Sequence, residues 1–388
     1  MSYGADLSFG FYQPTRIVFG AGVVRDLALE CKRLGVERAV IVTDKVLRER
    51  TDVVSRVQAA LGARCAGIYD GVIPDTSVQT IDQGAAFAKQ KGCDGLISVG
   101  GGSSIDTAKG IAIVLTMGGG IRDHQGSQSL GRKQTTHIAV PTTAGTGSEV
   151  SQYAVVKDHE AHEKMHYADD HIVPDTAVLD PEVTLGMPRG LTAATGADAL
   201  THAIEAYQSI NRNPMSDTLA LGAIRLIAQY LAKACEDGSD LVARGQMLVA
   251  ANLAGMAFNA SGVGLVHAMA HIVGARYGVH HGTANAICLP HVMRFNADEL
   301  SARLRDIADA LGIDVRGMSD EAAAQAASDA VLKLNARIGL PAHLREVGVP
   351  ENELDACAEQ SLSDGAIVYN GKFAADKDLV LGVYRAAY

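Results

Sequence analysis

The pattern of hydrophobic positions changes near the middle of this 388-residue chain. In the first half, short apolar runs alternate with stretches of helical periodicity. Several of these runs are apolar at consecutive positions, which is typical of parallel strands buried on both faces. We expect strands at residues 16–20, 38–44, 64–71, 95–101, 136–143 and 177–180. Strands that alternate with helices predict a doubly wound, mostly parallel, Rossmann-like α/β sheet.

Beyond residue 190 the strand pattern stops, and Ala and Leu recur at helical spacing. This periodicity predicts helices over residues 217–234, 243–258, 300–312 and 321–339. We therefore expect a dinucleotide-binding α/β domain over residues 1–187 and an all-helical, metal-binding catalytic domain over residues 188–388. Because ligand sites occur preferentially at domain interfaces, the active-site cleft is expected between the two.

Composition excludes several classes of function. The formal net charge is −10 and the chain has no Lys/Arg-rich block, which argues against nucleic acid or an anionic membrane as partner. The N-terminus lacks the basic and apolar regions of a signal peptide, and no apolar run approaches the roughly 18 residues of a membrane span. The six cysteines are scattered and form no C-x-x-C pair. These features predict a cytoplasmic protein with reduced cysteines.

The segment "LISVGGGSSIDTAKGIAIVL" (residues 96–115) has the pattern of a strand, a glycine turn and a helix. Gly101 and Gly102 let backbone amides approach a ligand closely, and the N-terminus of a helix favours a pyrophosphate. Ser103 is expected to cap the helix, with Asp106 as the acidic half of a capping box. The spacing is not G-x-G-x-x-G, so a purely structural tight turn is the alternative interpretation.

Two further features fit a nucleotide. In the loop "AVPTTAGTGSEVS", the hydroxyls of Thr142, Thr143 and Thr146 can contact a nucleotide, although ordinary turn chemistry is the alternative. Asp44 ends the strand at 38–44, where a carboxylate can accept a hydrogen bond from a ribose 2′-hydroxyl and repel a 2′-phosphate. That role favours NAD over NADP, whereas an N-cap for the next helix is an equally compatible role for Asp44.

Four of the 13 histidines fall within residues 264–286. Asp198 and His202 stand four residues apart on an expected helix, so both side chains can reach one ion. With His267 and His281 they provide one oxygen and three nitrogen ligands, a set that suits Fe²⁺ or Zn²⁺ and leaves room for substrate. Glu205, three residues beyond His202, is interpreted as structural.

The other two histidines of this segment have less certain roles. His271 lies one turn after His267, so it is either a ligand or an unligated imidazole that relays a proton. His280 directly precedes His281 and is expected to face solvent.

Several motifs together resemble the iron-containing (group III) alcohol dehydrogenase family over nearly the whole chain. They are "GGGSSIDTAKG", "PTTAGTGSEV", "LTAATGADALTHAIEAY", "GLVHAMAH" and "HGTANAICLPHVMRFN", in that order. The resemblance implies that His271 is a non-ligand histidine beside metal ligands Asp198, His202, His267 and His281. It implies nucleotide contacts at Asp44, Gly101, Gly102, Ser103, Thr142, Thr143 and Lys164. A homo-oligomer, a dimer or larger, is implied by the resemblance alone.

The chain departs from the family pattern at four places, the first being Ser104, where many relatives carry Pro after the glycine turn. "GVIPDTS" puts Asp75 at a usual cofactor contact, where many relatives carry Asn-Pro. "GARYGVHHG" carries Arg276 and His280 where many relatives have more neutral residues. If both turn inward, they favour a substrate with a distal carboxylate; a solvated arginine is the alternative. "SDGAIVYNGKF" lacks the common Asn-Pro-Arg.

These features predict a metal-dependent, NAD(H)-linked alcohol dehydrogenase or aldehyde reductase. Hydride would pass reversibly between the nicotinamide and a small primary or secondary alcohol, with Fe²⁺ as the expected ion and Zn²⁺ as the second choice. His271 is expected to pass the proton to solvent, and Phe258 either lines the substrate pocket or is a core aromatic. Two alternatives are a hydroxyacid–oxoacid type transhydrogenase that retains its cofactor and a metal- and NAD-dependent lyase of the dehydroquinate synthase type.

Overall fold

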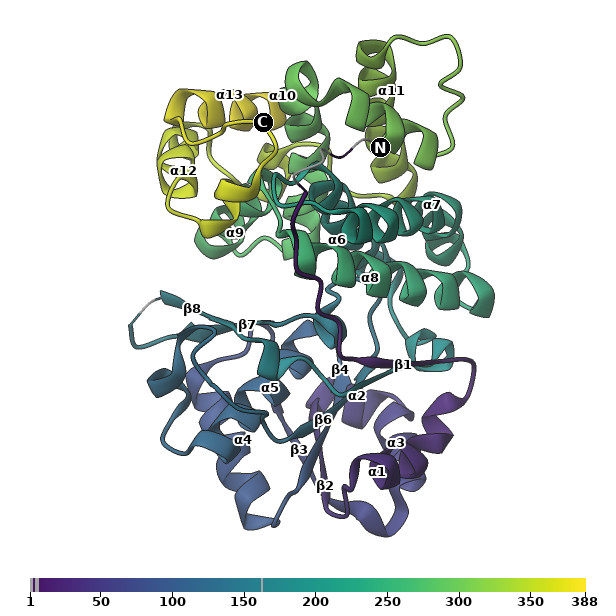
Figure 1. Ribbon diagram of the computed structural model, residues 1–388, viewed down its shortest axis with the longest axis vertical. Helices are drawn as coiled ribbons and strands as arrows, with labels where there is room; N and C mark the ends of the chain where they lie inside the picture. Colours follow the sequence, from purple (N-terminus) through teal and green to yellow (C-terminus); the bar gives the residue numbers. More distant parts are fainter. Residues whose placement is uncertain (1–2, 4–6, 162) are drawn as a thin grey trace. The chain divides into compact units, whose positions relative to one another are not determined.

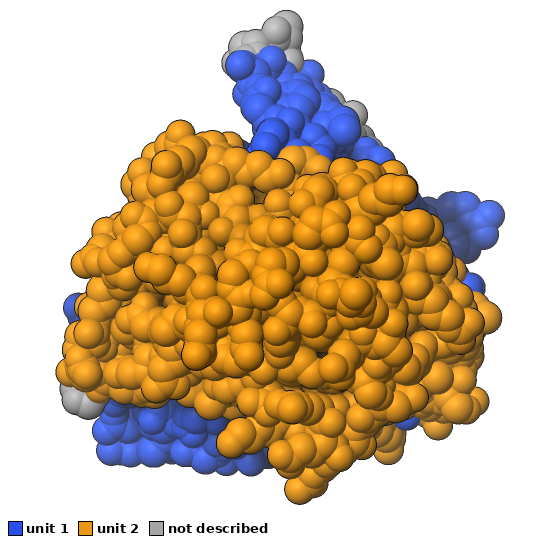
Figure 2. Space-filling view, turned by 90° about the horizontal axis from the view of Figure 1, so that it is seen from below, with its two compact units in different colours: residues 1–13, 193–235, 256–388 blue, residues 14–192, 236–255 orange. Residues whose placement is uncertain are grey.

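The computed structural model describes residue 3, residues 7–161 and residues 163–388. The chain divides into two compact units, each built from separate stretches of sequence (Figure 2). We call residues 14–192 and 236–255 the α/β unit, and residues 1–13, 193–235 and 256–388 the helical unit. Dinucleotide binding by residues 1–187 and metal binding by residues 188–388 stay predictions. The cleft expected between these two domains also stays a prediction.

A six-stranded parallel sheet forms the centre of the α/β unit, in the order β1-β9-β6-β4-β2-β3. All six expected strands are confirmed, with ends that differ by one or two residues. Their bounds are Arg16–Phe19 (β1), Ala39–Asp44 (β2), Cys65–Val72 (β3), Gly95–Gly100 (β4), Thr136–Pro141 (β6) and Thr176–Leu179 (β9).

Helices cover both faces of this sheet, so consecutive strand residues are buried in two separate cores (Figure 1). Val40 and Leu96 point toward α4 (Val78–Gln90) and α5 (Gly102–Met117). The next residue in each strand, Ile41 or Ile97, belongs to the core under α1 (Leu27–Leu34) and α3 (Val53–Leu61). Burial on both faces explains why the strands are apolar at consecutive positions.

A second, three-stranded sheet was not anticipated from the sequence. It pairs β7 (Tyr153–Asp158) antiparallel with β8 (Glu163–Ala168), and the short β5 (Gly126–Ser127) joins β8. Along β7 buried and half-buried residues alternate, as expected for a sheet with one covered face. Lys164 therefore lies on a strand, opposite Lys157.

No strand is assigned within the helical unit over residues 193–235 and 256–388, which confirms the expected change from sheet to helix. Its sequence forms α6 (Arg189–Gln208), α7 (Pro214–Glu236), α9 (Leu265–Tyr277), α10 (His281–Ala310), α11 (Asp320–Ile338), α12 (Leu354–Ser361) and α13 (Lys377–Ala387). The first residues of α6 and the last of α7 belong to the α/β unit.

Helix α8 (Leu241–Ser261) is the one described helix whose length and mean hydropathy match those of a membrane span. The expectation that no segment approaches such a length was therefore wrong. Of its most apolar 18-residue window, 67% is buried inside the protein, which is the burial of a core helix. Its apolar composition serves packing within the fold.

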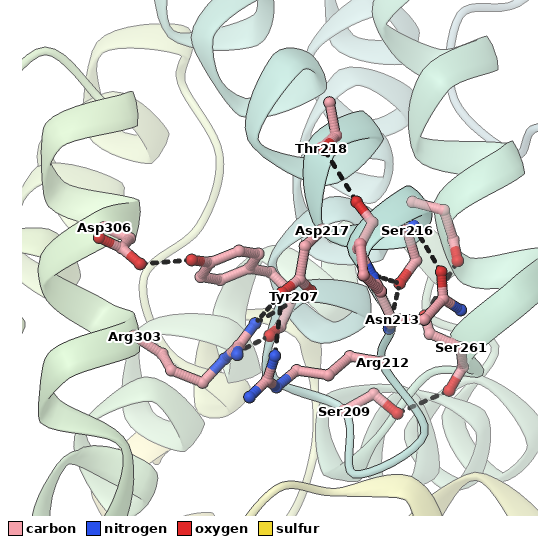
Figure 3. Close-up of polar contacts among 12 residues, drawn as sticks. Tyr207, Ser209, Arg212, Asn213, Ser216, Asp217, Thr218, Ser261, Arg303 and Asp306 are labelled. Atoms are coloured by element: carbon pink, nitrogen blue, oxygen red, sulfur yellow. Dashed lines mark hydrogen bonds and ion pairs between the residues drawn. The ribbon is translucent and has the colours of Figure 1, made fainter. Parts of the chain in front are cut away.

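Buried polar contacts tie the end of α6 to α10 (Figure 3). The fully buried carboxylate of Asp217 accepts hydrogen bonds from Arg303 (Nη2 to both oxygens, 3.0 Å) and from Arg212 (3.0 Å). Arg303 also donates to the backbone oxygen of Tyr207 at 2.7 Å, and its guanidinium lies 4.0 Å from the centre of that ring. The Tyr207 hydroxyl donates to Asp306. These contacts hold α6 and α10 together, and both helices carry residues of the histidine cluster described next.

Candidate active site

Three helices of the helical unit bring together the predicted metal ligands. Asp198 and His202 lie one turn apart on α6, His267 lies in the first turn of α9, and His281 is the first residue of α10. From Asp198 Oδ1, the Nε2 atoms of His202, His267 and His281 are 3.9, 4.0 and 3.5 Å away. Residues from three separate stretches of sequence therefore converge on one point.

The donor set fits a divalent cation. The ligand atoms of Asp198, His267 and His281 lie within 4.8 Å of one another. Separations of 3.5–4.0 Å from the carboxylate oxygen are too long for hydrogen bonds, but they suit ligands that share one ion at about 2.0–2.2 Å each. Asp198, His202 and His267 are buried, and His281 is half-buried.

The ionisation states also suit metal binding. Burial alone would raise the pKa of Asp198, but the facing imidazoles and a hydrogen bond from Asn285 reverse this effect and lower the pKa to about 2. Burial lowers the pKa of His267 and of His281 well below the usual value of 6.5. Asp198 thus offers a charged carboxylate, and His267 and His281 offer neutral imidazoles, which are the forms that bind a metal.

Neighbouring side chains hold this cluster in place. Glu205, also on α6, contacts His267 Nδ1 through its carboxylate at 2.5 Å. Asn285, one turn after His281 on α10, donates to Asp198 Oδ1 at 2.7 Å. The ring of Phe258 stacks on the imidazole of His202 with centroids 4.5 Å apart. Phe258 is 8% exposed and packs against a predicted ligand, so both proposed roles, pocket lining and core aromatic, stay compatible with its position.

His271 lies beside the ligand cluster. Its ring stacks on that of His281 at 5.4 Å and meets that of His267 edge-on at 5.9 Å. Its Nδ1 is 2.8 Å from Asp364 Oδ2, and both residues are half-buried. An imidazole whose Nδ1 proton bonds to a carboxylate presents Nε2 as a proton acceptor.

The predicted substrate residues Arg276 and His280 lie outside this cluster of contacts. The guanidinium of Arg276 pairs with Glu353 on the surface, and its Nε donates to the Tyr277 hydroxyl. His280 is exposed and directly precedes α10. The expectation that His280 faces solvent is confirmed, while a substrate role for either residue stays a prediction.

In the α/β unit, the two glycine-rich loops touch each other. A Cβ atom on Gly101 would lie 3.0 Å from Thr143 Oγ1, and one on Gly102 would lie 2.9 Å from Thr146 Cγ2. Thr142 donates its backbone N–H to Gly100 O at 3.0 Å, directly beyond the paired strands β4 and β6. Glycine is required where the two loops pack against each other, and the predicted close approach to a ligand stays a prediction.

The predicted capping box at α5 was wrong. The N-cap is Gly101 rather than Ser103, and Gly101 has no side chain with which to cap the helix. Asp106 instead accepts hydrogen bonds from Ser148 Oγ at 2.6 Å and from the backbone N–H of Val155 at 3.1 Å. Asp106 therefore joins α5 to the loop after β6 and to β7, and its predicted contact with the nucleotide stays a prediction.

The next helical turn carries a buried lysine that sequence reasoning did not single out. Lys109 is fully buried and donates from Nζ to Ser148 Oγ, Ser151 O and Tyr153 O at 2.7–3.0 Å. Burial lowers its pKa to about 8, although Asp106 and Glu149 act against this shift. Lys109 completes the polar network that fixes the loop after β6.

The other predicted nucleotide residues lie around the same strand ends. Asp44 is the N-cap of α2 (Lys45–Arg50), where its Oδ1 accepts from Leu47 N at 2.9 Å. Asp75 adopts a left-handed backbone with φ of 52° and donates its N–H to Ser103 Oγ at 3.1 Å. Lys157 Nζ lies 2.6 Å from Asp75 Oδ2, and Lys157 pairs across β7–β8 with Lys164.

Comparisons with known proteins agree with this arrangement. Residues 14–181 match the family described as iron-containing alcohol dehydrogenase, and residues 192–388 match the C-terminal part of the Fe-containing alcohol dehydrogenase family. The chain is 39% identical over 372 residues to the NAD-dependent methanol dehydrogenase of Bacillus methanolicus, covering 95% of this chain and 97% of the relative. It is 41% identical over 366 residues to the lactaldehyde reductase of Escherichia coli (strain K12), covering 93% and 95%.

Among solved structures, a 1,3-propanediol oxidoreductase superimposes with a TM-score of 0.96 at 38% sequence identity. The match covers 98% of this chain and 100% of that chain. The similarity therefore extends over the two glycine-rich loops of the α/β unit and over the histidine cluster of the helical unit.

Proposed function

This chain belongs to the iron-containing alcohol dehydrogenase family, and from that membership we propose how its residues carry out the reaction. It is an NAD-linked alcohol dehydrogenase and aldehyde reductase. Hydride passes reversibly between the nicotinamide and the carbinol carbon of a small primary or secondary alcohol. The observation that carries the proposal is that ligand atoms of Asp198, His267 and His281 lie within 4.8 Å of one another, with His202 Nε2 3.9 Å from Asp198 Oδ1.

We propose these four residues as the metal ligands, with Fe²⁺ as the native ion and Zn²⁺ as a possible substitute. One carboxylate and three imidazoles suit either borderline cation, and the description of the family favours iron. A bound ion acts as a Lewis acid on the carbonyl or alcohol oxygen, while the nicotinamide cofactor supplies or accepts the hydride. Asp198 offsets one unit of the charge of the ion.

His271 is the proposed proton carrier. In aldehyde reduction the product oxygen needs a proton, and in alcohol oxidation the hydroxyl must lose one. Asp364 holds His271 Nδ1 at 2.8 Å, so Nε2 is the atom that exchanges this proton. Because both residues are half-buried, the proton can continue to solvent.

The proposed nucleotide site consists of the loop amides and hydroxyls of the α/β unit. The N-terminus of α5 at Gly101, Gly102 and Ser103 suits the pyrophosphate. Thr142, Thr143 and Thr146 are proposed to add hydroxyl contacts, with Asp75 and Lys164 near the same loops. Asp44 Oδ1 caps α2, which leaves Oδ2 for a ribose hydroxyl and disfavours a 2′-phosphate.

The substrate is proposed to be a small aldehyde or alcohol, with Phe258 beside it. Whether Arg276 and His280 select a distal carboxylate is decided by comparing a neutral aldehyde with its ω-carboxylated analogue. A preference for the analogue that is lost in Arg276→Ala supports the anionic substrate. Equal rates in the wild type, or no change in the variant, contradict it.

We further propose that the enzyme acts as a homo-oligomer in the cytoplasm, without nucleic acid or membrane as partner. All six cysteines are free, as suits a reducing compartment.

The test of the proposed function is anaerobic NADH oxidation with a panel of short aldehydes. The protein is stripped with a chelator and reloaded separately with Fe²⁺ and with Zn²⁺. Activity that returns only on reloading supports the proposal. Bound metal and bound NADH without turnover would favour the retained-cofactor transhydrogenase or the lyase, and activity without added nicotinamide would identify the transhydrogenase.

A further inference from the structure

We propose that Glu205 is the positioning residue that makes His267 a metal ligand, by fixing both the orientation and the tautomer of its imidazole. The inference rests on the proposed metal site. Glu205 lies on α6 together with Asp198 and His202, but its carboxylate faces the start of α9 rather than the point where the ligand atoms converge.

Each oxygen of the Glu205 carboxylate has its own donor at the start of α9. Oε1 accepts the backbone N–H of Val266 at 2.6 Å, and Oε2 lies 2.5 Å from His267 Nδ1. Glu205 is 4% exposed, so no bulk water competes for these contacts. One side chain thus caps the N-terminus of α9 and holds the ring of a ligand carried by the same helical turn.

The surroundings of His267 assign its proton to Nδ1. The ionised carboxylate of Glu205 only accepts hydrogen bonds, so the His267 nitrogen that faces it carries the proton. At the other edge of the ring, the amide nitrogen of Asn285 lies 3.3 Å from Nε2 and can only donate. Both neighbours favour the same tautomer, in which the Nε2 lone pair faces Asp198 and His281.

His202 lacks such a carboxylate and depends on its neighbours in a different way. Among the described residues, its buried Nδ1 has no hydrogen-bond partner. Its ring is instead stacked between Phe258, at 4.5 Å, and His267, at 4.7 Å. Fixing the ring of His267 therefore also supports one side of His202, so that Glu205 influences two of the four proposed ligands.

The substitution Glu205→Gln tests the carboxylate itself, because it changes the hydrogen bonding of the side chain without removing its volume. The Gln amide replaces one of the two carboxylate oxygens by an NH₂ group, so the group that faced that oxygen, Val266 N–H or His267 Nδ1–H, loses its acceptor. When its NH₂ group faces His267, the imidazole proton moves to Nε2 and blocks the lone pair that a metal needs. Losing the carboxylate partner of a metal-binding histidine typically weakens metal affinity by roughly 10- to 100-fold.

The experiment is an anaerobic titration of Co²⁺ alone into chelator-stripped wild type, Glu205→Gln and Ser319→Ala. Affinity is obtained by competition with a chelator, and the visible absorption of Co²⁺ reports its coordination. Ser319 caps α11 by accepting from Ala322 N at 3.2 Å, so its variant loses a helix cap in the same unit without affecting the cluster. Urea unfolding of all three proteins measures the effect of each substitution on stability.

We expect Glu205→Gln to bind Co²⁺ roughly 10- to 100-fold more weakly with an altered spectrum, while Ser319→Ala binds as wild type does. Wild-type affinity and spectrum in Glu205→Gln would overturn this inference alone. Absence of Co²⁺ binding by the wild type would overturn the proposed metal site as well. If Glu205→Gln does not fold, Glu205→Asp, which withdraws the carboxylate by one methylene, must show weaker binding, and unchanged affinity there overturns the inference.

Discussion

A methyl group added at Gly255 tests how the loop after β6, which we propose as part of the nucleotide site, is held in place. Gly255 lies inside α8, where its backbone meets that of Gly147 in the loop after β6. A Cβ atom at position 255 would lie 2.7 Å from Val150 Cγ2, 2.9 Å from Gly147 Cα and 3.0 Å from Gly147 O. Two of these three contacts are with backbone, so the loop itself must move to admit the methyl group.

Two opposing contributions decide whether Gly255→Ala raises or lowers the free energy of unfolding. Replacing a helical Gly by Ala normally stabilises by about 0.5–1 kcal/mol, because the unfolded chain loses freedom. Forcing an extra methyl group into a packed site costs about 1–3 kcal/mol. At Gly255 the added methyl group would meet backbone atoms of Gly147, which cannot move aside as a flexible side chain can. The cost of overpacking is therefore the larger contribution, and we expect the free energy of unfolding to fall by about 1–2 kcal/mol.

The assay combines urea unfolding with NADH titration of Gly255→Ala, wild type and Gly382→Ala. Gly382 is an exposed residue inside α13, and a Cβ atom there would meet nothing within 4 Å. We expect a lower unfolding midpoint and weaker NADH binding in Gly255→Ala, and a slightly higher midpoint with unchanged binding in Gly382→Ala. A midpoint raised in both variants, with NADH affinity unchanged, would refute the close contact.

Two further predictions concern titratable groups. Burial lowers the pKa of His137, which lies 2.7 Å from Ser98 Oγ, to about 3. Between pH 6.5 and about 3 the unfolded chain binds a proton that the folded chain does not, so stability falls as the pH falls, by up to about 1.4 kcal/mol per unit. In urea unfolding at pH 7 and pH 5, His137→Gln should lose less stability than the wild type, and an equal loss would contradict the assignment. Asp364→Asn should lower kcat by up to ~10²-fold with metal content unchanged, because His271 loses the carboxylate that orients it; an unchanged kcat would exclude this role.

The sequence predicted the central sheet well because its strands carry a strong local pattern. Residues such as Val40 and Ile41 face two different cores, so the strand is apolar throughout. The hairpin of β7 and β8 lacks such a run. "YAVVKD" alternates buried with half-buried positions and "EKMHYA" is mixed, so neither stands out without knowledge of its partner strand.

The histidine cluster was predictable because its parts follow helical spacing and recurring motifs, but the residues that hold it were not. Asp364 meets His271 from 93 positions away, and no local pattern connects the two. The spacing of Glu205, three residues after His202, indicates only a structural role, and its partners Val266 and His267 could not be identified because they follow some 60 positions later. The predicted capping box does not form because the Asp106 carboxylate accepts hydrogen bonds from Ser148 and Val155, which are distant in sequence.

The central claim is that the hydride of NADH reaches the carbinol carbon only when a divalent ion occupies the Asp198–His202–His267–His281 site. The direct measurement is anaerobic reduction of a short aldehyde with NADH deuterated at the transferring C4 position, before and after reloading stripped enzyme with Fe²⁺. We expect one deuterium on the carbinol carbon of the alcohol after reloading and none before. Alcohol without deuterium, or equal transfer by the stripped enzyme, would contradict it.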